Sequence, residues 1–87
     1  MATHAQAEKR ARQNDKRRER NRLHKTAMRT AIRKLRKAIE TGDKSEAGKL
    51  LEAAVSRISR TASRGAIHAN KAARTVSRLT RAFFKMQ

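Results

Sequence analysis

The stretch SRGAIHANKAARTVSRLTR, residues 63–81, holds side chains whose types and spacing suit binding to an anion. Its basic residues recur at steps of three and four: His68, Lys71, Arg74, Arg78 and Arg81. On a helix this spacing places them along one face. The guanidinium group of arginine binds phosphate through paired hydrogen bonds and keeps its charge. We therefore expect this face to bind phosphate groups, because residues 57–87 contain no Asp or Glu that would neutralise it.

A plainer interpretation of the same stretch is a solvated basic face, on which His68 and Asn70 only cap the start of a helix. Polar faces of amphipathic helices usually point to solvent. The lack of acidic partners favours binding for the three cations that follow Asn70, which are Lys71, Arg74 and Arg78. For His68 and Asn70 both interpretations stay open.

A second basic stretch lies near the N-terminus. Residues 7–25, AEKRARQNDKRRERNRLHK, hold nine Lys and Arg against three Asp and Glu, and Leu23 is their one large apolar residue. Such a segment has too little apolar surface to enter a protein core, and its like charges oppose collapse. It is either a solvated tail or a segment that lies against a strongly negative partner.

The residues that catalysis or metal binding would need are absent or scattered. His4, His24 and His68 lie far apart, and the sequence has no Gly-rich phosphate loop, serine nucleophile motif or His-x-x-x-His pair. The chain has no cysteine, which excludes disulfides and thiolate metal sites. A small alanine-rich chain also has little room for a pocket of titratable groups. We therefore expect no enzyme activity, no catalytic residue, no metal, no cofactor and no small-molecule substrate.

The charge balance points to nucleic acid. The 87 residues carry a net charge of +17, and nucleic acid is the commonest natural partner of so basic a chain. Two Phe with no Trp or Tyr argue against proteins that stack single-stranded bases on aromatic side chains. Zinc-finger and leucine-zipper spacings are missing too. The sequence favours recognition of the backbone and shape of a folded RNA, with non-specific, nucleoid-type binding to DNA as the alternative.

A membrane surface is a third class of partner. A basic helix that binds membranes needs a broad apolar face on the same helix as its charges, and residues 7–25 offer only Leu23. No segment approaches the ~20 apolar residues of a membrane span, and no apolar signal segment follows the N-terminus. We therefore expect no membrane partner and a cytoplasmic location.

The elements that must position these residues are helices. The chain contains no proline and three glycines, and it is rich in Ala, Arg, Lys and Leu. Apolar residues at helical spacing between Met28 and Ile39 predict a first helix from about residue 8 to residue 39. Only its last third is amphipathic, so we expect the first ~20 residues to fray in the free protein and to become ordered on binding.

Two turns separate this helix from two further ones. Gly42 suits the left-handed residue that ends a helix, and Asp43 suits an N-cap with Glu46 as its capping-box partner. A second helix over about 44–63 follows, and Gly65 ends it. A third helix over about 67–85 directs inward Ala69, Ala72, Ala73, Val76, Leu79 and Phe83. The pattern predicts an all-α fold: a three-helix antiparallel bundle, with a long basic N-terminal helix extending beyond it, in one domain over residues 1–87.

Three segments together resemble the family of bacterial small-subunit ribosomal protein number twenty: GAIHANKAARTVSRL (65–79), MRTAIRKLRKAIETGDKSEA (28–47) and KRARQNDKRRERN (9–21). The likeness covers nearly the whole chain, and its specific part is the core G-x-I-H-x-N-K-A-A-R. The residues that match the family motif are Gly65, His68, Asn70, Lys71 and Arg74. The resemblance implies a three-helix bundle, direct binding to 16S ribosomal RNA, a first helix that runs along the RNA, no catalysis and no cofactor.

We therefore predict a structural RNA-binding protein, monomeric within the small ribosomal subunit, that helps to assemble and stabilise folded helices of 16S ribosomal RNA. Its contacts should go mostly to phosphates and 2′-hydroxyls rather than to base edges. The residues expected to bind the RNA are Arg10, Arg17, Arg18, Arg22, Lys25, Arg29, Arg33, Arg64, His68, Asn70, Lys71, Arg74 and Arg78.

Overall fold

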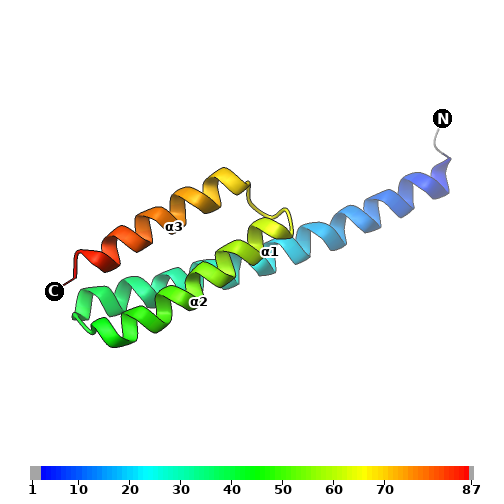
Figure 1. The fold of residues 1–87 in the computed structure, drawn as a ribbon. Helices are drawn as coiled ribbons and strands as arrows, with labels where there is room; N and C mark the ends of the chain where they lie inside the picture. Colours follow the sequence, from blue (N-terminus) through cyan, green and yellow to red (C-terminus); the bar gives the residue numbers. More distant parts are fainter. Residues whose placement is uncertain (1–2, 87) are drawn as a thin grey trace.

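The computed structural model of the chain describes residues 3–86, and in that range it contains three helices and no strand. The helices are α1 (His4–Thr41), α2 (Lys44–Ser63) and α3 (Ala69–Phe84). Figure 1 shows α1 and α2 side by side in opposite directions, with α3 returning along α2. The contacts of α3 are mainly with α2, and its approach to α1 is slight. The predicted all-α, antiparallel three-helix bundle is confirmed.

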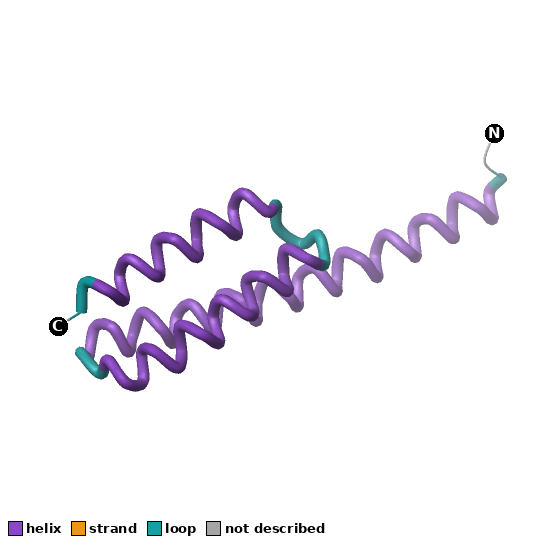
Figure 2. The backbone as a smooth tube through the Cα atoms, in the orientation of Figure 1, coloured by secondary structure: helices purple, strands orange, loops and turns teal. Residues whose placement is uncertain are grey.

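The first helix extends well beyond the second. Its 38 residues correspond to about 57 Å at ~1.5 Å per residue, and the molecule measures 62 × 20 × 14 Å. Every residue from 4 to 20 is exposed, and we call residues 4–20 the arm. Figure 2 shows the arm as a continuous helix with no other element beside it. None of the helices within residues 3–86 is long and apolar enough to span a membrane.

The start of α1 lies earlier than predicted, because a capping box at Thr3 begins the helix. The Thr3 hydroxyl oxygen accepts a hydrogen bond from the Gln6 N–H at 3.2 Å, and the Gln6 side chain accepts one from the Thr3 N–H at 2.9 Å. This reciprocal capping box begins the helix at His4 rather than near residue 8. At the other end Gly42 has a φ of 80°, which confirms its predicted left-handed role.

The turn into α2 forms half of the predicted capping box. The Asp43 side chain accepts a hydrogen bond from the Glu46 N–H at 3.1 Å, as an N-cap does. The Asp43 N–H, however, donates to the carbonyl oxygen of Ala38 at 3.3 Å. The Glu46 side chain was predicted to accept the Asp43 N–H as the second half of a capping box. That prediction is wrong, because the Asp43 N–H bonds the last turn of α1 instead.

The start of α3, in contrast to that of α1, lies later than predicted. The His68 ring is the N-cap of this helix, since its Nδ1 accepts the Asn70 N–H at 3.0 Å. The helix begins at Ala69 instead of residue 67, and Ile67 is buried in the core just before it. Ala69 and Ala73, which were predicted to point inward, are exposed. Because α3 packs mainly on α2 and approaches α1 only slightly, the other helices cover a narrower stripe of α3 than in a tightly closed bundle. Ala69 and Ala73 lie outside that stripe.

The core consists of small and medium-sized side chains. Its largest fully buried members are Leu35, Ile58 and Thr61. The Thr61 hydroxyl donates to the carbonyl oxygen of Arg57 at 2.8 Å and approaches that of His24 at 3.4 Å, so its polarity is satisfied. The same contact places the C-terminal end of α2 beside His24. The part of α1 that precedes this point therefore extends past the end of α2.

Candidate nucleic-acid interface

The face of α1 that packs on α2 changes from apolar to polar and basic where α2 ends. Inside the bundle this face carries Met28 and Leu35, which are buried. Toward the N-terminus, helical spacing continues the same face with four residues that we call the inner row: Asn21, Arg17, Asn14 and Arg10. The face is thus apolar where α2 covers it, and it carries guanidinium and amide groups farther out. Such groups suit phosphate oxygens and ribose hydroxyls.

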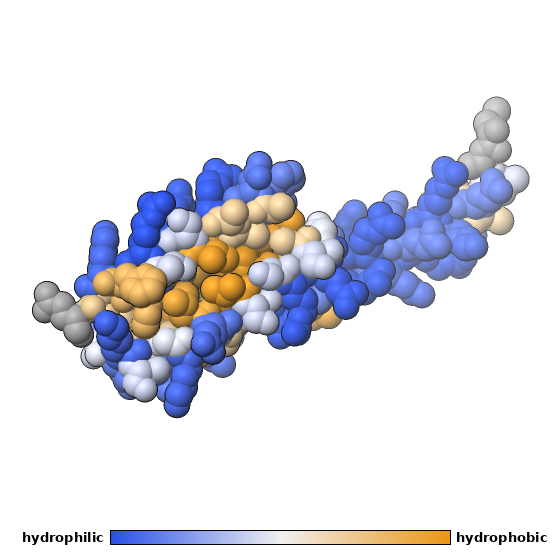
Figure 3. Space-filling view, viewed as in Figure 1, coloured by the Kyte–Doolittle hydropathy of each residue, from blue (hydrophilic) through white to orange (hydrophobic). Residues whose placement is uncertain are grey.

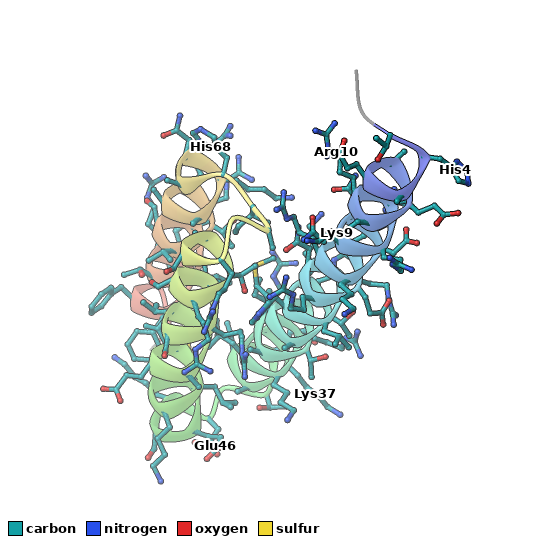
Figure 4. The ribbon with its side chains drawn as sticks, turned by 90° about the vertical axis from the view of Figure 1, so that its right-hand side faces the viewer. His4, Lys9, Arg10, Lys37, Glu46 and His68 are labelled. Carbon is teal, nitrogen blue, oxygen red and sulfur yellow. The ribbon has the colours of Figure 1, made fainter. Side chains whose placement is uncertain are left out.

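The carboxylates of the arm lie on its other side. Glu8, Asp15 and Glu19 follow one another at seven and four residues and so form one stripe. At ~100° per residue this stripe is turned by about 160° from Arg10. Figure 4 shows Arg10 on the side of the arm toward the bundle, with His4 on the opposite side. The inner row is therefore directed away from the acidic groups of the same helix.

One predicted site residue already has an acidic partner. Arg22 donates to both carboxylate oxygens of Glu19, with its Nε 3.2 Å from Oε2. This hydrogen bond, and secondly the opposite charges, lower the pKa of the Glu19 carboxyl and raise the pKa of Arg22. The Arg22 side chain remains 65% exposed. Its guanidinium group can bind a phosphate if it leaves the Glu19 carboxylate or bonds the carboxylate and the phosphate together.

A groove of about 740 Å³ lies between α1 and α3, and we call it the α1/α3 groove. Its lining includes one carboxylate, Glu40, and five cations: Arg29, Arg33, Arg36, Lys37 and Lys71. Three of these cations were predicted as binding residues, whereas Arg36 and Lys37 were missed. The spacing from Arg33 to Arg36 is helical and could have revealed the first of the two. Lys37 lies four residues after Arg33, so helical spacing could have revealed it as well. That both residues line a groove depends on the position of α3 beside α1.

Two smaller hollows extend the basic surface along α1. One, of about 440 Å³, is lined by six residues of α1: Asn14, Arg17, Arg18, Asn21, Arg22 and Lys25. The other, of about 330 Å³, lies where α2 ends and brings Arg64 close to Arg17, Arg20 and His24. The fold thus joins Arg64 to the cations of α1, although the two lie far apart in the sequence. Arg20 and His24 were not among the predicted residues.

The cations of α3 form one exposed stripe. At ~100° per residue, an arc of about 80° contains Lys71, Arg74, Arg78, Arg81 and Lys85. The Arg74 Nε donates to the Asn70 carbonyl oxygen at 3.4 Å, which leaves its terminal nitrogens available. His68 acts as a helix cap, in agreement with the plainer interpretation of this residue. Because Nδ1 accepts the Asn70 N–H, Nε2 is the ring nitrogen that a ligand could reach.

The predicted residues form an elongated surface rather than one compact site. Arg10 and Arg17 lie on the arm, Arg29 and Arg33 in the α1/α3 groove, and Arg78 on the α3 stripe. Figure 3 shows a hydrophilic arm, with apolar side chains gathered on the visible face where α3 lies against α2. The basic surface is therefore separate from the apolar part of that face.

The fold and this surface define a small helical protein whose cations are arranged for an extended anionic backbone. The family model described as "Ribosomal protein S20" matches residues 2–83. The chain is 48% identical over 81 residues to "Small ribosomal subunit protein bS20" of Desulfotalea psychrophila, with 93% of this chain and 91% of the relative covered. It is 52% identical over 81 residues to the protein of the same name from Syntrophobacter fumaroxidans, with 93% and 94% covered.

A third relative of that name, from Colwellia psychrerythraea, is 51% identical over 82 residues, with 94% of this chain and 95% of the relative covered. The chain therefore belongs to the ribosomal protein S20 family. The resemblance noted in the sequence is confirmed. The protein is a structural component of the ribosome and not an enzyme.

Proposed function

We propose that this protein is a monomeric constituent of the small ribosomal subunit that binds 16S ribosomal RNA directly, with the whole chain acting as one RNA-binding domain. In this role it helps to assemble the folded RNA helices and to stabilise them, and its location is the ribosome of the cytoplasm. The name shared by the relatives supports the small-subunit part of the proposal.

The observation that carries the RNA-binding part is the change of the α1 face beyond α2. A helix that is polar on every side gains no stability from a protein core, yet the arm keeps its three carboxylates on the side away from the inner row. Its inner row replaces buried apolar residues with Arg10, Asn14 and Arg17, on the side that α2 would otherwise cover. RNA takes the place of α2 along the arm, and the amides of the row can bind ribose hydroxyls that DNA lacks.

The mechanism of stabilisation is electrostatic. Folded RNA brings phosphates of neighbouring helices close together, and their repulsion opposes the fold. A helix that presents arginine and lysine at steps of three and four residues neutralises such phosphates and releases their counterions. The residues proposed to make these contacts are Arg10, Arg17, Arg18, Arg22, Lys25, Arg29, Arg33, Arg64, His68, Asn70, Lys71, Arg74 and Arg78. Of these, Arg22 must exchange or share its bond to Glu19.

The test compares binding to a 16S ribosomal RNA fragment with binding to duplex DNA of equal length, over a series of salt concentrations. Phosphate contacts alone weaken steeply with salt for both ligands. We expect affinity for the RNA to persist at salt concentrations where DNA binding is lost. Two curves that fall together would make the protein a general polyanion binder and would favour the nucleoid-type alternative.

A further inference from the structure

The α1/α3 groove has a charge that its own protein neighbours do not balance. Five cations line it against the single carboxylate of Glu40. Within residues 3–86, the one ion pair between an arginine or lysine and a carboxylate is Glu19–Arg22, and the His4 ring lies 3.0 Å from the Glu8 carboxylate; neither contact belongs to the groove. A concave surface lined by one sign of charge concentrates its field and attracts ligands of the opposite sign. The groove is therefore built for an anion.

The shape of the groove defines what kind of anion fits. On the α1 side, Arg29, Arg33 and Arg36 recur at four and three residues, so their Cβ atoms follow one another at about 5–6 Å. Lys71 stands across from them on α3. A row of cations with one facing cation suits a chain of phosphates better than a single compact anion. The volume of about 740 Å³ lies within the range of small-ligand pockets, about 300–1,000 Å³, which suits a short piece of one strand inside the groove.

The helices that form the groove have few contacts with each other. The bundle is held by packing of α1 on α2 and of α2 on α3, whereas α3 approaches α1 only slightly. Apolar atoms of Met28 and Ile32 also line the groove. Met28 is already buried in the core, whereas the partly exposed Ile32 remains available for the ribose face of a bound strand. An anionic strand placed here contacts both helices and supplies the attraction that the protein contacts lack.

We propose that the α1/α3 groove holds a short stretch of single RNA strand, whose phosphates bridge the arginines of α1 to Lys71 of α3. This inference rests on the proposed function and adds a defined surface to it. Its consequence is that the RNA fixes the distance between α1 and α3. The bundle is then completed by the RNA and not by the protein alone.

The first test neutralises one cation on each wall with the double variant Arg33→Gln and Lys71→Gln. Both side chains are exposed and take no part in the His4–Glu8 and Glu19–Arg22 contacts, so the fold should persist, which circular dichroism checks. The matched control is Lys34→Gln with Lys49→Gln, two exposed cations of α1 and α2 that do not line the groove. Each lost phosphate contact lowers the slope of log K against log salt by about 0.7–0.9.

We expect the groove variant to lose about 1.4–1.8 of this slope, at ~0.7–0.9 for each contact, and the control to lose less than about 0.5. Equal losses in the two variants would overturn the groove proposal. The outcome is distinct from failure of the proposed function, which appears in the unmodified protein as a lack of preference for 16S ribosomal RNA over DNA. If that preference exists and the two variants behave alike, only the groove proposal is wrong.

A second test measures the bridging directly. Because the chain has no cysteine, Thr26→Cys and Ala73→Cys introduce one spin label on α1 and one on α3 without further changes. Both positions are exposed and neither lines the groove. We expect the distribution of label-to-label distances to narrow when the RNA fragment is added, and to stay broad in the Arg33→Gln, Lys71→Gln background. An unchanged distribution in the otherwise unmodified protein would contradict bridging by RNA.

Discussion

Neutralising the inner row of the arm should weaken RNA binding far more than neutralising other cations of the same helix. The perturbation is the double variant Arg10→Gln with Arg17→Gln. The control is Arg12→Gln with Lys16→Gln, which also removes two charges from the arm. All four side chains are exposed, and glutamine is a good helix former, so both variants keep the helix. At ~100° per residue, the control pair lies at least about 100° away from the inner row.

The expected magnitude follows from one phosphate contact for each arginine. Each contact contributes about 0.7–0.9 to the slope of log K against log salt, so the inner-row variant should lose about 1.4–1.8. As salt rises fourfold, the affinity ratio between unmodified protein and variant should then shrink about 7- to 12-fold. The assay is fluorescence anisotropy with a labelled 16S ribosomal RNA fragment over a salt series.

The comparison with the control pair decides the outcome. If Arg12→Gln with Lys16→Gln lowers the slope of log K against log salt as much as the inner-row variant does, the cations of the arm contribute equally whichever side they lie on. The argument from the inner row would then be refuted, although RNA binding itself would stand.

Four further predictions concern the core, the Glu19–Arg22 pair and the order of the arm. Leu35→Ala truncates a fully buried side chain and should lower the free energy of unfolding, measured by thermal unfolding, by about 2–5 kcal/mol. A loss below about 1 kcal/mol would contradict this, because it would mean that the surrounding side chains fill the cavity. Glu19→Gln removes the acidic partner of Arg22 and should tighten RNA binding by about two- to fivefold, whereas weaker binding would mean that the pair positions Arg22 for the RNA. The Glu19–Arg22 pair should also make the stability of α1 depend on pH. Because the pKa of Glu19 is lowered, the stability that the pair adds is present above the ordinary glutamate pKa of about 4.3 and is lost as pH falls through the lowered pKa. In a pH titration of helix content, Glu19→Gln should abolish this component. Finally, the free protein at low concentration should show less helix by circular dichroism than its three helices require, with the gain on adding RNA arising from residues 1–25, because the arm has no core to pack against; full helicity without RNA would disprove this coupled folding.

The fold could be predicted because its signals are local. The apolar period from Met28 to Ile39 and the left-handed turn at Gly42 depend on neighbouring residues alone. The start of α1 could not be found in this way, because the capping box at Thr3 precedes a segment without an apolar stripe. The exposure of Ala73 depends on how far α3 stands from α1, which is a property of the whole bundle.

The candidate site could be predicted less well than the fold. Spacing identifies a basic stripe such as the one on α3, but it does not select individual members within a dense field of charge. Arg36 and Lys37 have helical spacing from Arg33, but the groove that they line exists only because α3 lies beside α1. Arg22 has the charge of a binding residue, but Glu19 lies three residues before it on the helix and takes up its guanidinium group.

The measurement that tests the central claim most directly is a competition between two ribosomal RNAs. The protein is mixed with deproteinised 16S and 23S ribosomal RNA at equal nucleotide concentrations, in salt high enough to suppress binding to DNA, and the protein bound to each is quantified. Direct recognition of folded 16S ribosomal RNA predicts that most of the protein is found on the 16S molecule. An even distribution between the two RNAs would contradict the account, because cation contacts to phosphate alone cannot distinguish them.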